Sequence, residues 1–244
     1  DDVRAIDWRV TARSGTAHTK LFHEDREQPI LVAIDQRTPM KFGSTQCFKS
    51  VMAAHVGTLA LWSALGAGER VGGVVLGDNS LSDTRPKRSQ HSVLRVIGDL
   101  VREGAPTADD NAPSNDLSDL LQQLERIARP GTRIFLISDF HDLLEADNFS
   151  PLRRLARRTQ LVGIAVNDRL EAELPRSGHY SVTDGNHHSS LDTSADTIRE
   201  AYASQYCSNQ ELTARRLREL RIPLLRISTG DDPLRRLLTV FPAR

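Results

Sequence analysis

The chain has 244 residues and carries 32 lysine and arginine side chains against 32 aspartate and glutamate side chains, so its formal net charge is zero. This balance argues against a nucleic-acid-wrapping surface and against a polybasic membrane anchor. Hydrophobic residues make up 39% of the chain and charged residues 26%, which is the composition of a globular protein. The two cysteines, Cys47 and Cys207, form no CxxC pair, which disfavours a disulfide framework or a structural zinc site and favours a reducing compartment.

The chain begins with charged residues, so it shows no signal-peptide pattern. It also lacks an initiator methionine, so we expect it to be trimmed or to be a fragment of a longer protein. Residues 50–68 contain no formally charged side chain and could nearly span a bilayer. Polar residues and glycines within this stretch favour a buried helix instead. We therefore expect a cytoplasmic chain that does not insert into a membrane, while a membrane anchor in upstream residues stays open.

Short apolar runs alternate with longer segments of helical periodicity. Strands are predicted over residues 30–34, 71–76, 133–138, 161–166 and 223–227. Helices are predicted over residues 51–65, 89–103, 117–127, about 195–220 and 233–240, with a short basic helix around Leu152 and Leu155. This alternation predicts an α/β fold with a doubly wound, mostly parallel sheet and helices on both faces.

Two segments depart from the alternation. Residues 1–29 precede the first strand and are predicted to form a short β-rich flank. Residues 169–192 contain Pro175, Gly178 and the pair Asp184-Gly185, which predicts a small hairpin or extended excursion at one edge. The remainder, residues 30–244, is predicted to be one domain, with a loop over residues 104–115.

Four aspartates, Asp35, Asp78, Asp139 and Asp168, each follow a predicted strand. In a parallel sheet these positions meet at the carboxyl edge, where ligands collect. Asp35 and Asp139 directly end β-rich runs, and converging carboxylates at such an edge can hold Mg²⁺. The alternative is that the aspartates accept backbone hydrogen bonds in the turns and cap helices.

The residues Asp2-Val3-Arg4-Ala5-Ile6-Asp7-Trp8-Arg9-Val10-Thr11-Ala12-Arg13 resemble the signature of the bacterial family catalogued as domain of unknown function 58. Further matching runs follow in order: His18–Lys20, Phe22–Glu27 into Ile30–Asp35, Gly68–Gly72, Ile137–Phe140 and Ser228–Leu234. The resemblance implies a von Willebrand factor A-like fold with a metal-ion-dependent adhesion site. It also implies a protein partner, and specifically an adaptor role beside a MoxR-type AAA+ ATPase.

The adhesion-site pattern of that fold is Asp-x-Ser-x-Ser after the first strand, a threonine in a later loop and an aspartate after a middle strand. The resemblance assigns the first aspartate to Asp35 and the last to Asp139. Arg37 and Pro39 stand where the two serine ligands belong, and Asn115 is the best match to the threonine. Two ligands of the pattern are therefore kept, so the expected site is degenerate and Mg²⁺ binding is expected to be weak or absent.

Arg37 is two residues from Asp35, and a guanidinium fork can bind carboxylates bidentately. One hypothesis is that Arg37 takes the place of the metal, pairing with Asp35 and, in its wider form, with Asp139. The alternative is that Arg37 points into solvent. The edge expected to bind a partner comprises Asp35, Arg37, Thr38, Asn115, Asp139 and His141.

Other candidates have ordinary structural explanations. Adjacent histidines His187 and His188 on an extended segment point to opposite faces, so a metal site there is disfavoured. Cys47 has no visible base partner and is expected to be an inert thiol. The basic cluster in residues 153–158 is expected to be a solvated helix face, although it could contact an acidic partner. With 5% aromatic residues, a base-stacking platform for nucleic acid is not supported.

Two functions remain open on the sequence alone. The first is a non-enzymatic protein-interaction domain that acts as an adaptor for a MoxR-type ATPase. The second is a Mg²⁺-dependent phosphohydrolase that uses the strand-end carboxylates Asp35 and Asp139, with Asp35 as nucleophile. Arg37 disfavours the second function, because it occupies the position of the acid/base aspartate and an arginine cannot release a proton at neutral pH.

Overall fold

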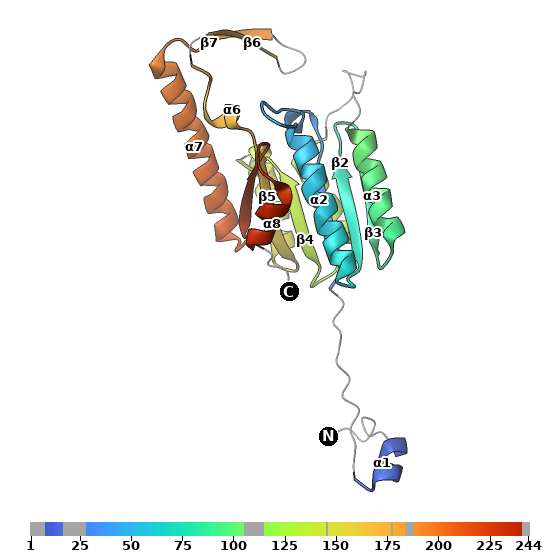
Figure 1. Cartoon of the computed structure of the whole chain (residues 1–244). Helices are drawn as coiled ribbons and strands as arrows, with labels where there is room; N and C mark the ends of the chain where they lie inside the picture. Colours follow the sequence, from blue (N-terminus) through green and yellow to red (C-terminus); the bar gives the residue numbers. More distant parts are fainter. Residues whose placement is uncertain are drawn as a thin grey trace.

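A computed structural model describes residues 8–16, 28–104, 115–144, 146–176, 178–183 and 188–240 (Figure 1). Its main sheet has six strands in the order β3-β2-β1-β4-β5-β8. The strands are β1 (Ile30–Asp35), β2 (Val71–Leu76), β3 (Leu81–Lys87), β4 (Arg133–Ser138), β5 (Gln160–Asn167) and β8 (Leu224–Ser228). All neighbouring pairs are parallel except β2 and β3, which are antiparallel.

Helices cover both faces of the sheet and create two cores. One face packs against α2 (Lys49–Gly66), α3 (Gln90–Glu103) and α8 (Pro233–Val240). The other packs against α4 (Leu117–Ile127), α5 (Ala146–Ala156) and α7 (Asp196–Glu219). In β1, Val32 and Ile34 belong to the first core while Leu31 and Ala33 belong to the second. An uninterrupted apolar run is needed in such a strand, because alternate side chains are buried on opposite faces.

The predicted α/β class is confirmed, with each of the five predicted strands present to within a residue or two. Strand β3 was not predicted. It contains Pro86 and several charged residues, because it lies at the edge of the sheet and only its Thr84 is buried. Proline and charge are tolerated there, since an edge strand does not need every backbone N–H for pairing.

The described part of the N-terminal flank differs from the β-rich expectation. Helix α1 occupies Trp8–Ser14. An isolated strand would leave its backbone hydrogen-bonding groups without partners, whereas a helix satisfies its own. Residues 1–7 and 17–27 lie outside the described residues.

Between β5 and α7 the chain forms a short helix α6 (Arg169–Ala172) and an antiparallel pair, β6 (His179–Thr183) with β7 (His188–Asp192). Figure 1 shows this hairpin above the carboxyl end of the main sheet, next to the N-terminal end of the long helix α7 (Asp196–Glu219). The hairpin occupies the segment in which the sequence predicted an excursion. The predicted loop over 104–115 lies largely outside the described residues.

Helix α2 contains the uncharged stretch noted in the sequence. Its buried face includes Met52, Val56 and Leu61, while Trp62 and Val51 are each 39% exposed. Within the described ranges, no helix combines the length and the hydrophobicity that a membrane crossing requires. The uncharged stretch is explained by packing, because α2 lies over the central strands and touches both α3 and α8.

Candidate functional site

The carboxylate of Asp35 ends β1 at the carboxyl edge of the sheet and is completely buried. It accepts hydrogen bonds from Arg37 Nε at 3.0 Å, from Arg37 Nη2 at 2.8 Å and from the backbone N–H of Arg37 at 3.1 Å. Ser138, at the end of the neighbouring strand β4, donates its hydroxyl to the same carboxylate at 2.9 Å. Both oxygens of Asp35 therefore have partners, as a buried carboxylate requires.

The guanidinium of Arg37 is buried between two acidic side chains. Besides the bidentate pair with Asp35, its Nη1 lies 2.6 Å from Asp142 Oδ2 and 3.4 Å from the backbone oxygen of Asn115. Burial alone would lower the pKa of Arg37, but the hydrogen bonds and negative charges of Asp35 and Asp142 outweigh it and raise that pKa. Arg37 is thus a permanent cation at this edge, and the solvent-pointing alternative is wrong.

A second buried cation, Lys49, lies at the first position of α2. Its Nζ is 2.8 Å from Asp139 Oδ2 and 2.5 Å from Glu171 Oε1, and only 2% of its side chain is exposed. A cation at a helix N-terminus opposes the helix dipole. The two carboxylates compensate: burial would lower the pKa of Lys49, and the charges of Asp139 and Glu171 raise it above its usual value.

Asp139 is therefore paired with Lys49. The wider form of the Arg37 hypothesis, in which Arg37 also binds Asp139, is wrong, because the acidic partners of Arg37 are Asp35 and Asp142. Burial would raise the pKa of Asp139, but the charge and hydrogen bond of Lys49, with the backbone N–H of His141, hold it below its usual value. The sequence did not single out Lys49. The available signal was a lone lysine at a helix start, directly before a long uncharged stretch.

The turn after β4 is held by Phe140, whose φ of 59° lies in the left-handed region. Its ring is buried in the core between the sheet and helices α4, α5 and α7. Its backbone N–H donates to Ser138 Oγ at 3.2 Å. A left-handed conformation is costly for an aromatic residue and persists only where the surroundings enforce it. This turn points Asp139 toward Lys49 and Asp142 toward Arg37.

The other two strand-end aspartates bind loops. Asp78, after β2, accepts from the backbone N–H of Thr38 at 2.7 Å, from the Thr38 hydroxyl at 2.9 Å and from Lys41 Nζ at 3.2 Å. Asp168, after β5, accepts from Ser44, from Thr229 Oγ1 at 2.5 Å and from the backbone of α6. Burial would raise the pKa of each, but these hydrogen bonds lower it.

Together these contacts fix the loop 41–48 on the carboxyl edge. Thr45 Oγ1 lies 2.9 Å from Thr229 Oγ1, and the backbone N–H of Lys49 donates to the oxygen of Phe42 at 2.7 Å. The loop nevertheless exposes 42% of Phe42 and 53% of Phe48. The sequence pattern did not single out this pair. Large apolar side chains on a pinned loop are the kind of residue that anchors protein interfaces.

The remaining predicted edge residues lie around this network. Thr38 and His141 are exposed at the edge, and Thr38 is tied to Asp78. Asn115 does not turn its side chain toward Asp35; its Nδ2 donates to the backbone oxygens of Gly77 and Ser80, both at 3.1 Å. Pro39 lies in the short 3₁₀ helix η2 (Thr38–Met40), where it offers no oxygen ligand from its side chain.

The residues present do not fit a divalent cation. Asp35 is occupied by a guanidinium and Asp139 by an ammonium group, which already neutralise the charge that a metal would neutralise. Within the described ranges, no three histidine, cysteine, aspartate or glutamate side chains are grouped in a way that could hold a metal ion. His187 and the side chain of His188 lie outside the described residues.

Two other sequence candidates have structural partners. Cys47 Sγ lies 3.6 Å from the backbone oxygen of Thr229. Its pKa is raised by burial and by the charge of Asp168, which makes a nucleophilic thiolate less favourable. In the basic cluster on α5, Arg154 pairs with Glu125 of α4 at 2.9 Å.

Comparison with known proteins places this geometry in a family. Residues 1–212 match the family described as "Protein of unknown function DUF58". The uncharacterized protein Rv1480 of Mycobacterium tuberculosis is 29% identical over 239 residues, which cover 95% of this chain and 72% of that protein.

Solved structures show a related fold. The hypothetical protein BatB from Bacteroides thetaiotaomicron is similar with a TM-score of 0.51 at 11% identity, covering 87% of this chain and 95% of that one. The SpRpn10 VWA domain gives a TM-score of 0.45 at 14% identity, covering 88% and 95%. These likenesses concern the fold alone. The fold is similar to that of BatB, and the match over residues 1–212 shows that the chain belongs to the DUF58 family.

Proposed function

We propose that this chain is a non-enzymatic protein-interaction domain whose partner docks on the carboxyl edge of the sheet without a divalent cation. The proposal rests on one observation: Arg37 and Lys49 are buried against Asp35 and Asp139, at the edge where a cation would otherwise hold the two carboxylates together. Because each of these two carboxylates already has a cation beside it, neither needs a metal to be stable in the buried edge. In this proposal the degenerate adhesion site is a rigid platform formed by the buried pairs Arg37–Asp35 and Lys49–Asp139.

Contact with the partner is made by groups that surround this platform. The exposed side chains of Phe42 and Phe48 provide apolar anchors, and Thr38 and His141 provide polar groups at the rim. Anchors on a pinned loop lose little conformational freedom on binding, which favours affinity. The partner class that we propose is a MoxR-type AAA+ ATPase, for which this chain acts as an adaptor.

The alternative function, a Mg²⁺-dependent phosphohydrolase, receives no support from the site. Its nucleophile would be Asp35, whose carboxylate is completely buried and accepts hydrogen bonds from Arg37 and Ser138 on both oxygens. An attacking carboxylate oxygen needs an open approach to the phosphorus atom. No observation in the described part of the chain favours this function over docking.

The test is a direct binding measurement between this domain and the purified MoxR-type ATPase encoded in the same genome. Binding should be equal in Mg²⁺ and in EDTA when the ATPase is kept in one nucleotide state. The double variant Phe42→Ala/Phe48→Ala should weaken binding at least about tenfold, because hot-spot aromatic residues each contribute on the order of 2 kcal/mol.

A matched control is Leu94→Ala/Val101→Ala, which removes two exposed apolar side chains from α3. Equal weakening by both double variants would contradict the proposed edge while leaving the partner correct. Binding that EDTA abolishes in the wild type would contradict the metal-independent mechanism. Absence of any binding to the ATPase would contradict the proposed partner.

A further inference from the structure

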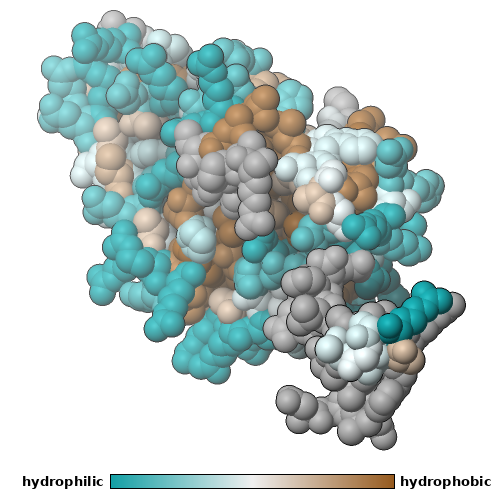
Figure 2. Space-filling model, turned by 60° about the horizontal axis from the view of Figure 1, so that its bottom comes forward, coloured by the Kyte–Doolittle hydropathy of each residue, from teal (hydrophilic) through white to brown (hydrophobic). Residues whose placement is uncertain are grey.

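A second, independent feature lies at the opposite, amino edge of the sheet. It is a groove of about 360 Å³ at the starts of β1, β2 and β4 and the end of β3. Its walls are formed by Pro29, Arg70, Arg85, Pro86, Lys87, Arg126, Ile127, Ala128, Arg129 and Thr132. Figure 2 turns this edge of the molecule toward the viewer.

The backbone of the groove is fixed by the sheet. The N–H of Ile30 donates to the oxygen of Arg70 at 2.8 Å, and the N–H of Arg133 donates to the oxygen of Pro29 at 2.9 Å. Gln28 Nε2 also donates to the oxygen of Gly131 at 2.9 Å, which connects the starts of β1 and β4. The groove is therefore a preformed feature, as small-molecule sites usually are.

A β-bulge shapes the wall that β3 contributes. The register between β2 and β3 shifts so that Val71 pairs with Lys87 and Gly73 with Thr84. Arg85 and Pro86 together face Gly72, where a Cβ atom would lie 2.3 Å from the oxygen of Thr84. Bulges commonly re-aim side chains next to functional sites. Here the bulge lies where Arg85 and Lys87 join the groove.

The lining is strongly basic. It contains five cationic side chains and, within its described residues, no acidic one. None of the five has an ion-pair partner in the part of the chain that the structure describes. The nearby carboxylate of Glu69 accepts a hydrogen bond from the backbone N–H of Gln28 at 3.0 Å. Arg126 and Arg129 lie at the C-terminal end of α4, where the helix dipole favours cations. The helix dipole does not explain Arg70, Arg85 and Lys87.

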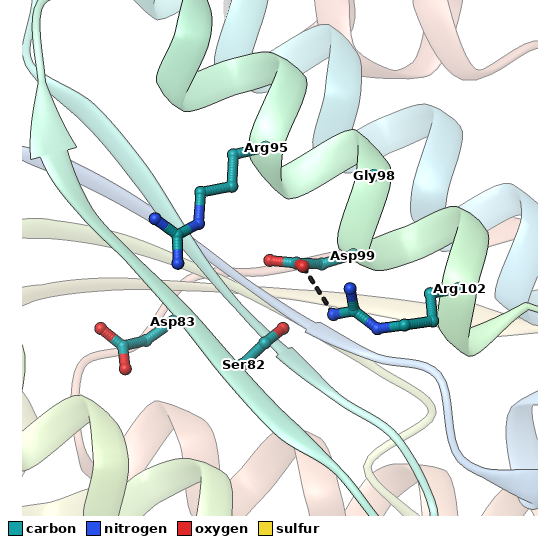
Figure 3. A pocket seen from close by; sticks show the side chains of 6 residues that line it. All are labelled: Ser82, Asp83, Arg95, Gly98, Asp99 and Arg102. Carbon is teal, nitrogen blue, oxygen red and sulfur yellow. Dashed lines mark hydrogen bonds and ion pairs between the residues drawn. The ribbon is translucent and has the colours of Figure 1, made fainter.

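A hollow elsewhere on the surface has a lining of mixed charge, with two arginines and two aspartates. The hollow between β3 and α3, about 580 Å³, combines Arg95 and Arg102 with Asp83 and Asp99 (Figure 3). Arg102 Nη2 lies 2.6 Å from Asp99 Oδ1, and Asp83 accepts from Gln123 at 3.0 Å. The lining of this hollow thus contains both signs of charge and one ion pair, whereas the described lining of the groove at the amino edge contains cations alone.

We propose that the groove at the amino edge binds a compact ligand that carries two or more phosphate groups. Five cations without an ion-pair partner among the described residues surround one small groove, which favours a ligand of high charge density. Arginine forks bind phosphate oxygens bidentately. Carboxylates on a peptide place fewer charges in the same volume. The residues that the structure describes in this lining include no aromatic side chain, so the ligand is recognised through its phosphates and not through a stacked base.

The experiment titrates the domain with tripolyphosphate at low ionic strength in an isothermal calorimeter, and in parallel with vesicles of phosphatidylcholine containing phosphatidylglycerol. The double variant Arg85→Gln/Arg126→Gln should weaken binding at least about tenfold, since it removes two charge-assisted contacts. The control Arg153→Gln/Arg218→Gln removes the same charge from exposed positions on α5 and α7 and should change the affinity by less than about twofold.

Tripolyphosphate binding that only the groove variant weakens supports a free phosphorylated ligand. Vesicle binding with the same selectivity, but no tripolyphosphate binding, overturns the compact ligand with several phosphates, because each phosphatidylglycerol headgroup carries only one phosphate. Equal weakening by both double variants, or no binding to either probe, overturns the proposal. A glutamate peptide of the same net charge that binds as tightly as tripolyphosphate also overturns it, because carboxylates would then suffice.

Discussion

The ammonium group of Lys49 lies 2.8 Å from the carboxylate of Asp139, although the two residues are 90 positions apart in the chain. The pair joins the first turn of α2 to the turn after β4. Glu171 adds a second carboxylate from α6. A buried ion pair of this kind holds its elements in register, but it becomes costly when either partner is removed alone.

Lys49→Met should therefore destabilise the domain by about 3 kcal/mol at neutral pH, because it leaves two carboxylates without their cation. Urea denaturation measures this loss. Lys49→Met/Asp139→Asn should lose less than the sum of the two single variants, since the double change removes the charges together. Strict additivity of the two losses would show that Lys49 and Asp139 do not interact.

Arg37→Ser/Pro39→Ser supplies the two hydroxyl groups that the adhesion-site pattern calls for, and it frees the carboxylate of Asp35. We expect this variant to unfold at a lower temperature than the wild type in EDTA and to regain part of that loss in Mg²⁺, because bound metal stabilises the folded state. The wild type should not respond to Mg²⁺. The same variant with Asp35→Asn serves as the control and should lose the response; a Mg²⁺ response in the wild type would contradict the role of Arg37.

The decrease of the free energy of unfolding in acid should depend partly on Asp168. Hydrogen bonds from Ser44 and Thr229 outweigh burial and lower the pKa of this carboxyl group in the folded protein. A group of this kind stabilises the fold above its unfolded pKa of about 3.9, and the contribution is lost as the pH falls through the lower folded value.

Asp168→Asn should consequently cost about 1–2 kcal/mol at pH 7, and this cost should shrink as the pH falls below about 3.9, because the advantage of the charged carboxylate fades there. Urea denaturation at pH 7 and at an acidic pH below about 3.9 measures the difference. Glu211→Gln, an exposed change of the same charge on α7, should leave the pH dependence unaltered. An equal loss at both pH values would assign the effect of Asp168→Asn to shape and not to charge.

Two glycines provide a matched test of the bulge. Gly72→Ala places a Cβ atom 2.3 Å from the backbone oxygen of Thr84, so the pairing of β2 and β3 must shift. We expect a loss of at least about 2 kcal/mol. Gly98→Ala, in the middle of α3, meets nothing within 4 Å and should stabilise the domain by about 0.5–1 kcal/mol. Thermal denaturation of both variants checks the pair; a neutral Gly72→Ala would show that β3 adapts freely.

Much of the architecture could be predicted from the sequence, because its signals are local. The run Ile30–Ile34 is apolar at every position, as a central parallel strand must be. The stripe from Leu117 to Ile127 has the period of a helix with one buried face, and the structure places α4 over those same residues. The edge strand β3 could not be recognised in this way, since only one of its seven residues is buried and the signal of alternation is lost.

The sequence also predicted that Asp35 and Arg37 lie close together, because residues two positions apart after a strand share one turn. It could not determine that Arg37 turns to Asp142, that Lys49 meets Asp139, or that Arg70, Arg85 and Arg126 line one groove. Those encounters depend on the order and register of strands that are distant in the chain, and on the bulge in β3. Only the tertiary structure decides them, since a periodic pattern carries no information about which strand ends become neighbours.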